Sequence, residues 1–504
     1  MVQKRGLVSV FLNTVEKVGN ALPHPATLFG IFALLILILS AVFSALGTSA
    51  VHPGTGAVYE AVNLLSQDGL HLILTKMVTN FTSFAPLGIV IVAMLGIGLA
   101  EHSGLIAVVI RSLVLYSPER LLTFIIVLAG IMSNLASSVG YVLLVPLAGT
   151  IFIAIGRHPI AGMAAGFAGV SGGYSANLVL GTIDPLLAGL SEEAAQLVDP
   201  AYTVNPTANY YFMVASTFLI ALLGTWVTEK IVVPRLGKWE GSSKDNEEIE
   251  KLSKEEKKGL LWSGLILVGF IGAILWLLLP ANGILRGEGG SLLKSPVLKG
   301  VVAVLFLVAG VMGLVYGIIT KKYKNDSDVM KGMADSMKTL AGYLVLVFFA
   351  AQFVEYFNWS NLGIILAIKG ANFIQGLNLG LIPLVILFVL FAGLINLVMG
   401  SASAKWALLA PIFVPMFMFL GYTPELTQVV YRIGDSTTNI ISPMMSFFAL
   451  IIVYFQRYQK NAGIGTLVAT MLPYTIVFFI GWIILLIVWI LAGWPLGPGA
   501  GIHL

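Results

Sequence analysis

Residues 400–439 read GSASAKWALLAPIFVPMFMFLGYTPELTQVVYRIGDSTTN. Two arms meet at a Gly-x-x-Pro turn, and a patch of glycine and serine stands before the first, apolar arm. The second arm ends in the polar cluster GDSTTN. Glycine and small hydroxyl residues free backbone carbonyls and amides, which hydrocarbon tolerates only where the backbone lines a cavity. The stretch therefore predicts membrane helices that bend around a polar site.

The same pattern occurs earlier in the chain, where residues 138–171 align with residues 403–436 without a gap. The informative matches are serines, prolines and glycines: Ser138 and Ser403, Pro146 and Pro411, Gly156 and Gly421, Pro159 and Pro424, Gly169 and Gly434, and Ser171 and Ser436. Matches of these residue types at one fixed spacing indicate an internal repeat. Duplicated membrane segments interrupted by glycine and proline are typical of the binding site of a secondary transporter.

Close helix packing is the alternative explanation of these small residues, because glycine and serine let two backbones approach each other in a membrane. Packing accounts for scattered glycines. It does not account for a polar cluster at the end of each copy, which reads GVSGGYSAN at 169–177 and GDSTTN at 434–439. We interpret both clusters as unwound segments that line a site.

The composition of the whole chain favours a membrane protein. Of the 504 residues, 58% are hydrophobic and 10% are charged, whereas an ordinary soluble domain is about 25% charged. Several apolar runs approach the ~20 residues that cross ~30 Å of hydrocarbon as a helix. The sequence shows no series of ~10-residue alternating segments, which would indicate a β-barrel. It therefore predicts an all-α polytopic membrane protein.

Several kinds of chemistry are excluded by what the sequence lacks. It has no cysteine, and therefore no disulfide or thiolate metal site. It also has no phosphate-binding P-loop motif for ATP hydrolysis and no paired histidines. The net charge of +4 comes from a few basic loops, which the positive-inside rule explains better than nucleic acid does. We expect no cofactor and no nucleic-acid partner, and an ion gradient of Na⁺ or H⁺ as the energy source.

Basic residues also predict the topology. The start MVQKRG is basic, and no lysine or arginine follows Lys460, so the N-terminus is predicted cytoplasmic and the C-terminus external. This requires an odd number of crossings, with some apolar runs re-entrant. We divide the chain into a first half at 1–234 with hairpin 1 near 137–158, a charged cytoplasmic linker at 235–259, and a second half at 260–504 with hairpin 2 near 401–423.

The second copy carries charges that the first copy lacks, since Lys405, Arg432 and Asp435 align with Gly140, Phe167 and Val170. Charged residues inside membrane segments are costly and are candidate functional residues. Arg432 can hold a carboxylate through two parallel hydrogen bonds, and Asp435 can bind a sodium ion or a proton. The alternative is a salt bridge between Arg432 and Asp435, which stand three residues apart on one helical face.

Two further residues have two interpretations each. Trp406 offers an aromatic face for a flat ligand, or it is a packing residue. Asp184 follows the first polar cluster in the segment GTIDP. It is either a carboxylate of the site or an ordinary acid of an external loop at 181–209, a segment with several acids and no lysine or arginine.

At these motifs the chain resembles the bacterial p-aminobenzoyl-glutamate transporter (AbgT) family. The most specific blocks are KWALLAPIFVPMFM at 405–418 and YRIGDSTTNIISPM at 431–444. Shorter blocks run through nearly the whole length: PHP at 23–25, FAPLG at 84–88, GRHP at 156–159, SANL at 175–178, PRLG at 234–237, NGILR at 282–286 and FNWSNLG at 357–363.

The resemblance implies a homodimer, with nine transmembrane helices and two re-entrant hairpins in each protomer, arranged as an inner core and an outer frame. The family's site positions fall here on Asp184, Asn396, Ser403, Trp406, Pro424, Arg432, Asp435 and Pro443. Of these, Asn396 and Asp435 resemble its sodium-binding positions. Some members carry an acid after the serine of the first hairpin, where this chain has Ser138, which implies an ion site in the first half that is weaker or that relies on backbone carbonyls.

Repeat, charges and resemblance together lead to an expected function. We expect a cation-coupled secondary transporter of the bacterial inner membrane that carries p-aminobenzoyl-glutamate, p-aminobenzoate or sulfonamide antimetabolites, by uptake or efflux. The alternatives are a sodium-coupled di- or tricarboxylate carrier, a passive channel and an intramembrane enzyme. No set of nucleophile, histidine and acid lies near either copy, so we expect a transporter and not an enzyme.

Overall fold

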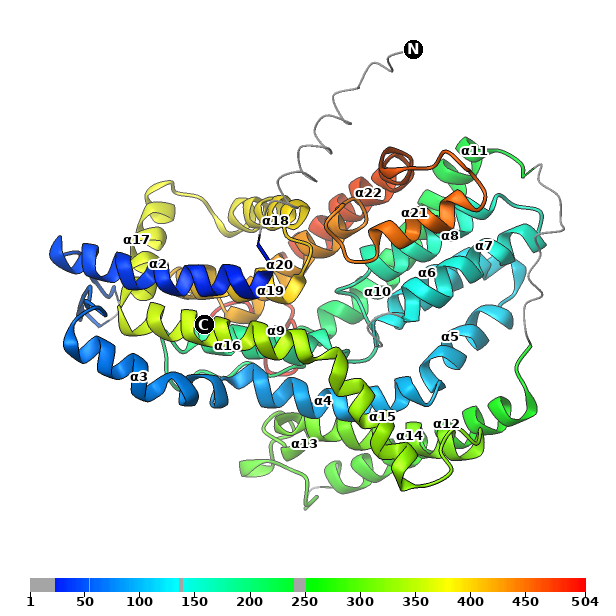
Figure 1. Cartoon of the computed structure of the whole chain (residues 1–504), viewed down its shortest axis with the longest axis horizontal. Coiled ribbons are helices and arrows are strands. Elements are labelled where there is room, and N and C mark those ends of the chain that lie inside the picture. Colours follow the sequence, from blue (N-terminus) through cyan, green and yellow to red (C-terminus); the bar gives the residue numbers. More distant parts are fainter. Residues whose placement is uncertain (1–22, 54, 136–138, 240–250, 281) are drawn as a thin grey trace, which may run out of the picture.

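The computed structural model describes residues 23–53, 55–135, 139–239, 251–280 and 282–504, and this part of the chain is nearly all helical (Figure 1). The first half contains α2 (Pro25–Ala45), β1 (Ser49–Val51), β2 (Val58–Glu60), α3 (Gln67–Thr82), α4 (Ala85–His102), α5 (Leu105–Leu115), α6 (Leu122–Met132), α7 (Val145–Ala154), α8 (Pro159–Phe167), α9 (Ile183–Ala195), α10 (Tyr210–Val227) and α11 (Val233–Leu236). Strands β1 and β2 form one short antiparallel hairpin.

The second half has the same helical character. It contains α12 (Lys254–Leu278), α13 (Pro296–Lys299), α14 (Val301–Ile319), α15 (Asp326–Thr339), α16 (Ala341–Trp359), α17 (Leu362–Gly376), α18 (Leu381–Val398), α19 (Ala402–Phe419), α20 (Pro424–Asn439), α21 (Phe448–Gln456) and α22 (Ile464–Leu491). Three π-helical turns adjoin these elements: Gly140–Leu144 before α7, Ala168–Gly172 after α8 and Thr228–Val232 between α10 and α11.

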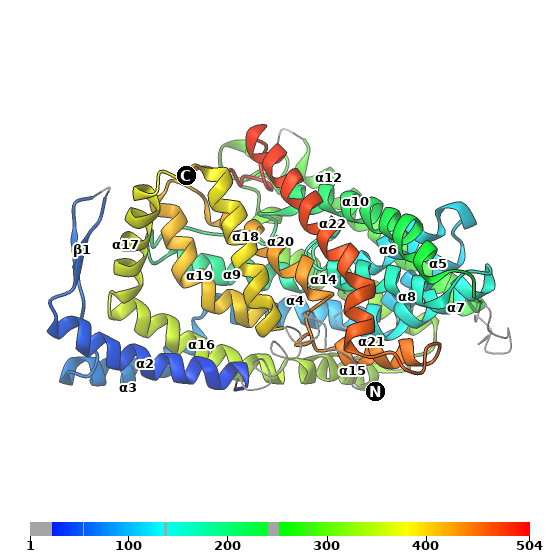
Figure 2. The same ribbon diagram turned by 90° about the horizontal axis from the view of Figure 1, so that it is seen from above.

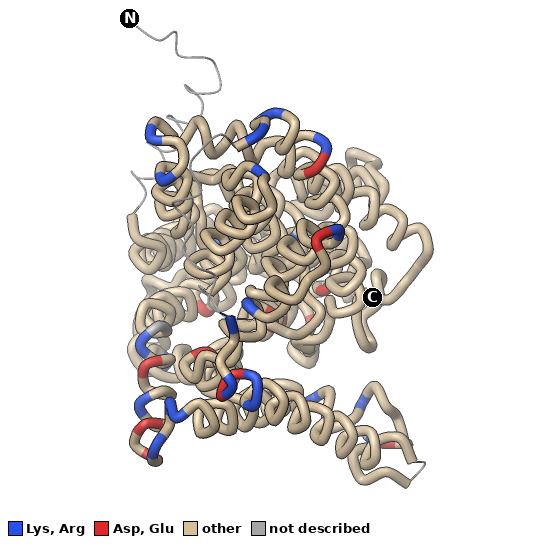
Figure 3. The backbone as a smooth tube through the Cα atoms, turned by 90° about the vertical axis from the view of Figure 1, so that its right-hand side faces the viewer, with Lys and Arg blue, Asp and Glu red and all other residues tan. Residues whose placement is uncertain are grey.

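The described residues include nine helices long and apolar enough to cross a membrane, or up to ten if a bent pair counts as one span. This confirms the prediction of an all-α polytopic protein. Figure 3 shows charged residues gathered at a few turns, with long uncharged stretches between them. Such a distribution suits helices whose middle faces lipid or other helices.

Burial separates an inner group of helices from an outer one. In the most apolar stretch of α12 only 6% is buried, against 67% in α19. Helices α12 and α14 pack side by side at one edge of the molecule, and α14 also packs against α4 (Figure 1). At another edge α2 lies along α16 (Figure 2). Helices α18, α19, α20 and α9 pack against one another inside this frame.

The repeat predicted from sequence recurs in the geometry of the two Gly-x-x-Pro turns. Gly156 has a φ of 72° and Gly421 a φ of 87°, which is the left-handed conformation that commonly ends a helix. The amide of the next residue donates to the carbonyl five residues back in both copies, from Arg157 to Phe152 and from Tyr422 to Phe417. In both turns a proline then starts the following helix, α8 or α20.

The structural similarity also extends upstream of the matched sequence. In the first copy the Nδ2 of Asn134 donates to the carbonyl of Val170 at 3.1 Å. In the second copy the Nδ2 of Asn396 donates to the carbonyl of Asp435 at 2.7 Å, and Asp435 is the residue aligned with Val170. Sequence alignment missed this pair because Asn134 stands six residues before Gly140, whereas Asn396 stands nine residues before Lys405.

In both copies an aligned glycine lies against the backbone of a neighbouring helix. A Cβ added to Gly169 would come within 2.3 Å of the Val127 carbonyl on α6, and one added to Gly434 would come within 2.5 Å of the Val389 carbonyl on α18. Neither contact leaves room for a side chain. Helix α6 therefore crosses the π-turn after α8 as closely as α18 crosses α20.

The unwound segments differ from the prediction in the second copy. In the first copy, residues 169–172 belong to the π-turn, and turns and irregular backbone then continue to the start of α9, so the predicted unwinding is confirmed for 173–177. In the second copy α20 continues to Asn439, so the cluster GDSTTN is helical. The prediction was wrong there because Thr437 and Thr438 donate to carbonyls four residues back on their own helix. The break follows, at 440–447.

Three predictions from sequence fall wholly or partly on residues outside the described ranges. These are the basic N-terminus, the linker at 235–259 (of which 240–250 are not described) and Ser138 at the start of hairpin 1.

Candidate substrate and ion site

Four helices from distant parts of the chain bring the candidate residues together. Helix α18 supplies Asn396, α19 supplies Lys405 and Trp406, and α20 supplies Arg432 and Asp435. Helix α9 supplies a fourth wall that packs on both α19 and α20. Ser401 caps α19 by accepting a hydrogen bond from the amide of Ala404 at 3.4 Å, so the first turn of α19 begins at the glycine–serine patch.

A buried group of polar side chains forms around Lys405. The Lys405 Nζ donates to the Oδ1 of Asp435 and to the Oδ1 of Asn396. The side chain of Lys405 is 0% exposed and that of Asp435 is 2% exposed. Sequence analysis noted the charge of Lys405 but gave it no role. A lysine inside an apolar arm is itself a sign of function.

The amide of Asn396 is held in one orientation by its other contacts. Its Nδ2 lies 2.8 Å from the Oγ1 of Thr438 and 2.8 Å from the Oδ1 of Asn439, in addition to the carbonyl of Asp435. With its nitrogen directed to α20, the Asn396 oxygen faces Lys405. The ammonium therefore meets two oxygens whose positions are set by the crossing of α18 and α20.

A second ion pair joins α20 to the start of α9. The Arg432 Nη2 lies 2.6 Å from the Oδ1 of Asp184, and the two side chains are 4% and 1% exposed. The Oδ2 of Asp184 accepts from the amide of Gly181 at 2.7 Å. Asp184 also sits in the first turn of α9, where the helix dipole favours a negative charge.

These pairs correct two interpretations from sequence. The segment at 181–209 is not simply an external loop, because it contains α9 and the buried Asp184. The alternative of a salt bridge between Arg432 and Asp435 is also wrong, since each pairs with a residue from another helix. The absence of lysine and arginine bears on the side of the membrane and does not distinguish a loop from a buried helix such as α9.

Arg432 retains unused hydrogen-bonding capacity. Its Nε and Nη1 are buried and have no hydrogen-bond partner. Unpaired polar atoms at buried positions are costly, and a guanidinium can bind a planar carboxylate through two parallel hydrogen bonds. Nε and Nη1 lie on different edges of the guanidinium, and each forms a parallel donor pair with Nη2. A carboxylate ligand can therefore bind either unpartnered nitrogen together with the second hydrogen of Nη2.

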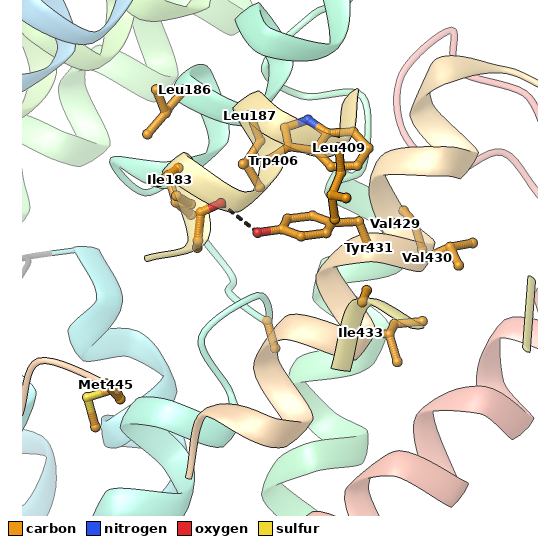
Figure 4. Close-up of a cluster of buried hydrophobic side chains, with 14 of the residues drawn as sticks. Ile183, Leu186, Leu187, Trp406, Leu409, Val429, Val430, Tyr431, Ile433 and Met445 are labelled. Carbon is orange, nitrogen blue, oxygen red and sulfur yellow. Dashed lines mark hydrogen bonds between the residues drawn. The ribbon is translucent and has the colours of Figure 1, made fainter. Parts of the chain in front are cut away.

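Trp406 is fully enclosed. Its ring stacks on Tyr431 with centroids 4.5 Å apart, and the hydroxyl of Tyr431 donates to the carbonyl of Ala402 (Figure 4). The indole Nε1 donates to the Oγ of Ser191 at 3.0 Å, and this hydroxyl donates to the Oε1 of Gln428 at 2.7 Å. Trp406 thus connects α19 to α9 and α20 through polar and aromatic contacts at once.

The hydrogen-bonded chain continues from Gln428 towards the loop before α10. The Nε2 of Gln428 donates to the Oδ1 of Asn209 at 2.9 Å, and the Nδ2 of Asn209 donates to the carbonyl of Glu425 at 3.0 Å. The hydroxyl of Tyr202, in the loop after α9, donates to the Glu425 carboxylate at 3.0 Å. Burial and this carboxylate raise the pKa of Tyr202.

Two adjoining cavities open beside the glycine–serine patch before α19. One, of about 480 Å³, lies between this patch, the start of α2 and α16. The other, of about 210 Å³, has the side chains of Tyr141 and Phe447 in its wall, and these rings stack 4.4 Å apart. Ser403 lines both cavities. The larger volume lies within the range of small-molecule sites.

The two candidate prolines lie at opposite ends of α20. Pro424 occupies its first turn, after the capping residue Thr423. Pro443 lies in the break between α20 and α21. The structure brings together Asn396, Asp435 and Lys405 in one group and Asp184 and Arg432 in another.

Sequence reasoning missed Ser191, Gln428 and Tyr431 as well as the role of Lys405. Gln428 is one of several polar residues in the second arm, and nothing in the sequence distinguishes it from the others. Ser191 had no signal either, because only the fold of α9 places it on Trp406. Among the described residues, no group of three or more histidine, aspartate and glutamate side chains could hold a metal ion.

Comparison with known proteins places this geometry in a family. The model of the "AbgT putative transporter family" matches residues 10–504. The p-aminobenzoyl-glutamate transport protein of Escherichia coli (strain K12) is 38% identical over 486 residues, covering 96% of this chain and 95% of that protein.

Two solved structures share the fold. The YdaH transporter of Alcanivorax borkumensis, described as having an unusual topology, superposes with a TM-score of 0.90 and 48% identity over 94% of this chain and 100% of that one. MtrF of Neisseria gonorrhoeae, described as illuminating a class of antimetabolite efflux pumps, superposes with a TM-score of 0.92 and 51% identity over 97% of this chain and 100% of that one. The chain belongs to the AbgT family and is a multi-pass membrane transporter, not an enzyme.

Proposed function

We propose that this transporter is a secondary active carrier of p-aminobenzoyl-glutamate, p-aminobenzoate or related sulfonamide antimetabolites, driven by a cation gradient across the bacterial inner membrane. The substrate class follows the name of the Escherichia coli relative and the description of the gonococcal one. The direction, uptake or efflux, depends on the gradients and on stoichiometry.

The observation that carries the proposal is the buried guanidinium of Arg432 with two unpartnered nitrogens. p-Aminobenzoate and its glutamate conjugate both carry a carboxylate, which can accept from one of these unpartnered nitrogens and from the second hydrogen of Nη2 in a dry site. Asp184 holds the third guanidinium nitrogen at 2.6 Å and so fixes the direction of the other two. We assign Arg432 as the substrate ligand and Asp184 as the residue that orients it.

The remaining predicted residues receive roles from their positions. Trp406, stacked on Tyr431, sets the aromatic wall near Arg432. Ser403 faces the two cavities through which a substrate would reach the site. Pro424 and Pro443 bound α20, which bears both charged residues, and we assign them to the movement of that helix during alternating access.

The cation acts, in this proposal, through Asp435 with Asn396. Both Na⁺ and H⁺ are compatible with a carboxylate as the coupling residue. Both residues are buried, and Asp435 lies one turn from Arg432 on α20, so the ion and the substrate would act on the same helix. We further propose a homodimer with a cytoplasmic N-terminus and an external C-terminus.

The test is transport in proteoliposomes with radiolabelled p-aminobenzoate or p-aminobenzoyl-glutamate, under a sodium gradient and a pH gradient imposed separately. We expect uphill movement under one gradient and its loss in Arg432→Met. Arg120→Met is a matched control, because Arg120 is exposed in the turn before α6. Normal transport by Arg432→Met, folded and at wild-type level, would contradict the proposed site.

Competition decides the substrate class. Inhibition by succinate or citrate, together with no inhibition by p-aminobenzoate, would identify a di- or tricarboxylate carrier instead. Downhill movement alone, under every gradient, would identify a passive channel.

A further inference from the structure

The position that the family resemblance implies for sodium is already in contact with a positive charge. Asn396 and Asp435 would be its ligands, and their Oδ1 atoms both accept from the Nζ of Lys405. These oxygens are also the groups that a sodium ion would require, because hard cations bind carboxylate and carbonyl oxygen. An ion at this point and the ammonium of Lys405 would therefore compete for the same oxygens.

The charges of the site lead to the same conclusion. Two buried carboxylates belong to these ion pairs, Asp184 and Asp435, and each has a cation of its own in Arg432 and Lys405. The group is neutral as it stands. Without a bound substrate carboxylate, a sodium ion added to it would leave a net positive charge at side chains no more than 4% exposed, where an uncompensated charge is strongly disfavoured. The residues present do not fit a bound sodium ion while Lys405 is in place.

Lys405 is held as a ligand of the site and not as a chance neighbour. It arises from the second turn of α19, so its side chain is anchored by a helix whose first turn is capped by Ser401. The Asn396 oxygen is aimed at it by the contacts of the Asn396 nitrogen with Thr438 and Asn439. In the first copy the aligned residue is Gly140, so only the second copy has this cation.

We propose that Lys405 is a tethered cation that takes the place of sodium between Asn396 and Asp435, so that this transporter uses no free sodium ion at that position. The proposal deepens the proposed function, and it rests on Asp435 being the cation-coupling residue. It follows that removing the ammonium, while keeping the two oxygens, converts the position into a sodium-binding site.

Sodium binding is measured apart from transport, as the Tm of the purified full-length protein when choline chloride is replaced by sodium chloride at constant ionic strength. We expect no sodium-dependent change in wild type. Lys405→Met and the smaller Lys405→Ala, purified in sodium, should both show a saturable rise. At 100-fold excess over Kd the rise is about 2–3 °C, from mass action and the per-residue entropy of unfolding.

Two control variants distinguish sodium binding from a general effect of a substitution or of salt on the Tm. Lys369→Met removes an exposed lysine from α17 and should behave as wild type. Lys405→Met/Asp435→Asn removes both charges and should fold without responding to sodium. A purely structural role of Lys405 would lower the Tm of the single variants equally in both salts, and that result overturns the proposal.

Two other results overturn it. One is a sodium-dependent rise in wild type that Asp435→Asn abolishes. The other is that neither single variant gains stability in sodium while the double variant folds. If sodium binding appears in the Lys405 variants but wild type moves no aromatic carboxylate, the inference about Lys405 stands and the proposed substrate fails.

Discussion

Breaking the ion pair between Asp184 and Arg432 should destabilise the protein by more than the loss of one hydrogen bond would. Asp184→Asn keeps the shape of the side chain and removes its charge. The guanidinium would then stay buried with no counter-charge, and two of its nitrogens already have no partner. Removing one member of a buried pair costs about 3–5 kcal/mol. Loss of the partner charge, and not of one hydrogen bond, sets this magnitude.

The expected change in Tm follows from the size of the chain. Unfolding entropy is about 2.1 cal/mol/K per residue, which gives about 1 kcal/mol per degree for a chain of 504 residues. Asp184→Asn should therefore lower the Tm by about 3–5 °C. The double variant Asp184→Asn/Arg432→Gln carries no unpaired charge and should recover most of this loss.

Thermal unfolding of the purified protein, with size-exclusion chromatography as a check on folding, measures these differences. Lys338→Met is the matched control, because it breaks an ion pair with Asp335 in which the lysine is 77% exposed, and it should change the Tm by less than about 1 °C. The reasoning is refuted if Asp184→Asn behaves like this control. It is also refuted if the double variant is less stable than both single variants.

Three further substitutions test the packing around the site by the same measurement. Gly169→Ala should lower the Tm clearly, because its Cβ would lie 2.3 Å from the carbonyl of Val127, whereas Gly264→Ala, with nothing within 4 Å, should not. Ser191→Ala should cost about 1–3 kcal/mol, since the buried tryptophan and glutamine that it bonds would each lose a partner; an unchanged Tm would show that these groups find other partners. Gly421→Ala should cost roughly 1–2 kcal/mol through its φ of +87° alone, and a loss much above this would point to contacts not seen in the structure.

The sequence predicted the all-helical membrane fold and the repeat because both depend on residue types at fixed spacing. Apolar runs give the spans, and the matched glycines and prolines give the two turns at Gly156 and Gly421, which the structure confirms. It could not predict which residues pair across helices. Nothing in the spacing of Arg432 and Asp435 shows that their partners are Asp184, on α9, and Lys405, on α19.

The end of α20 shows a second limit. Serine and threonine are compatible both with an unwound segment and with a helix in which their hydroxyls bond to carbonyls one turn back. In the first copy glycines at 172 and 173 accompany the cluster and the backbone unwinds. In the second copy the same region has Thr437 and Thr438, whose hydroxyls bond to the helix backbone, and the helix continues.

The same hydrogen bond, from an asparagine to a backbone carbonyl, occurs in both copies, but the residue that supplies the carbonyl differs in charge. Asn134 and Asn396 each donate to the carbonyl of an aligned residue, Val170 or Asp435. This hydrogen bond reaches only the backbone of the aligned residue, so it is compatible with different side chains there, apolar in one copy and charged in the other. The crossing of α18 with α20 thus supplies a preformed place for a carboxylate. The carboxylate of Asp435 occupies it, and α19 supplies the matching cation, Lys405.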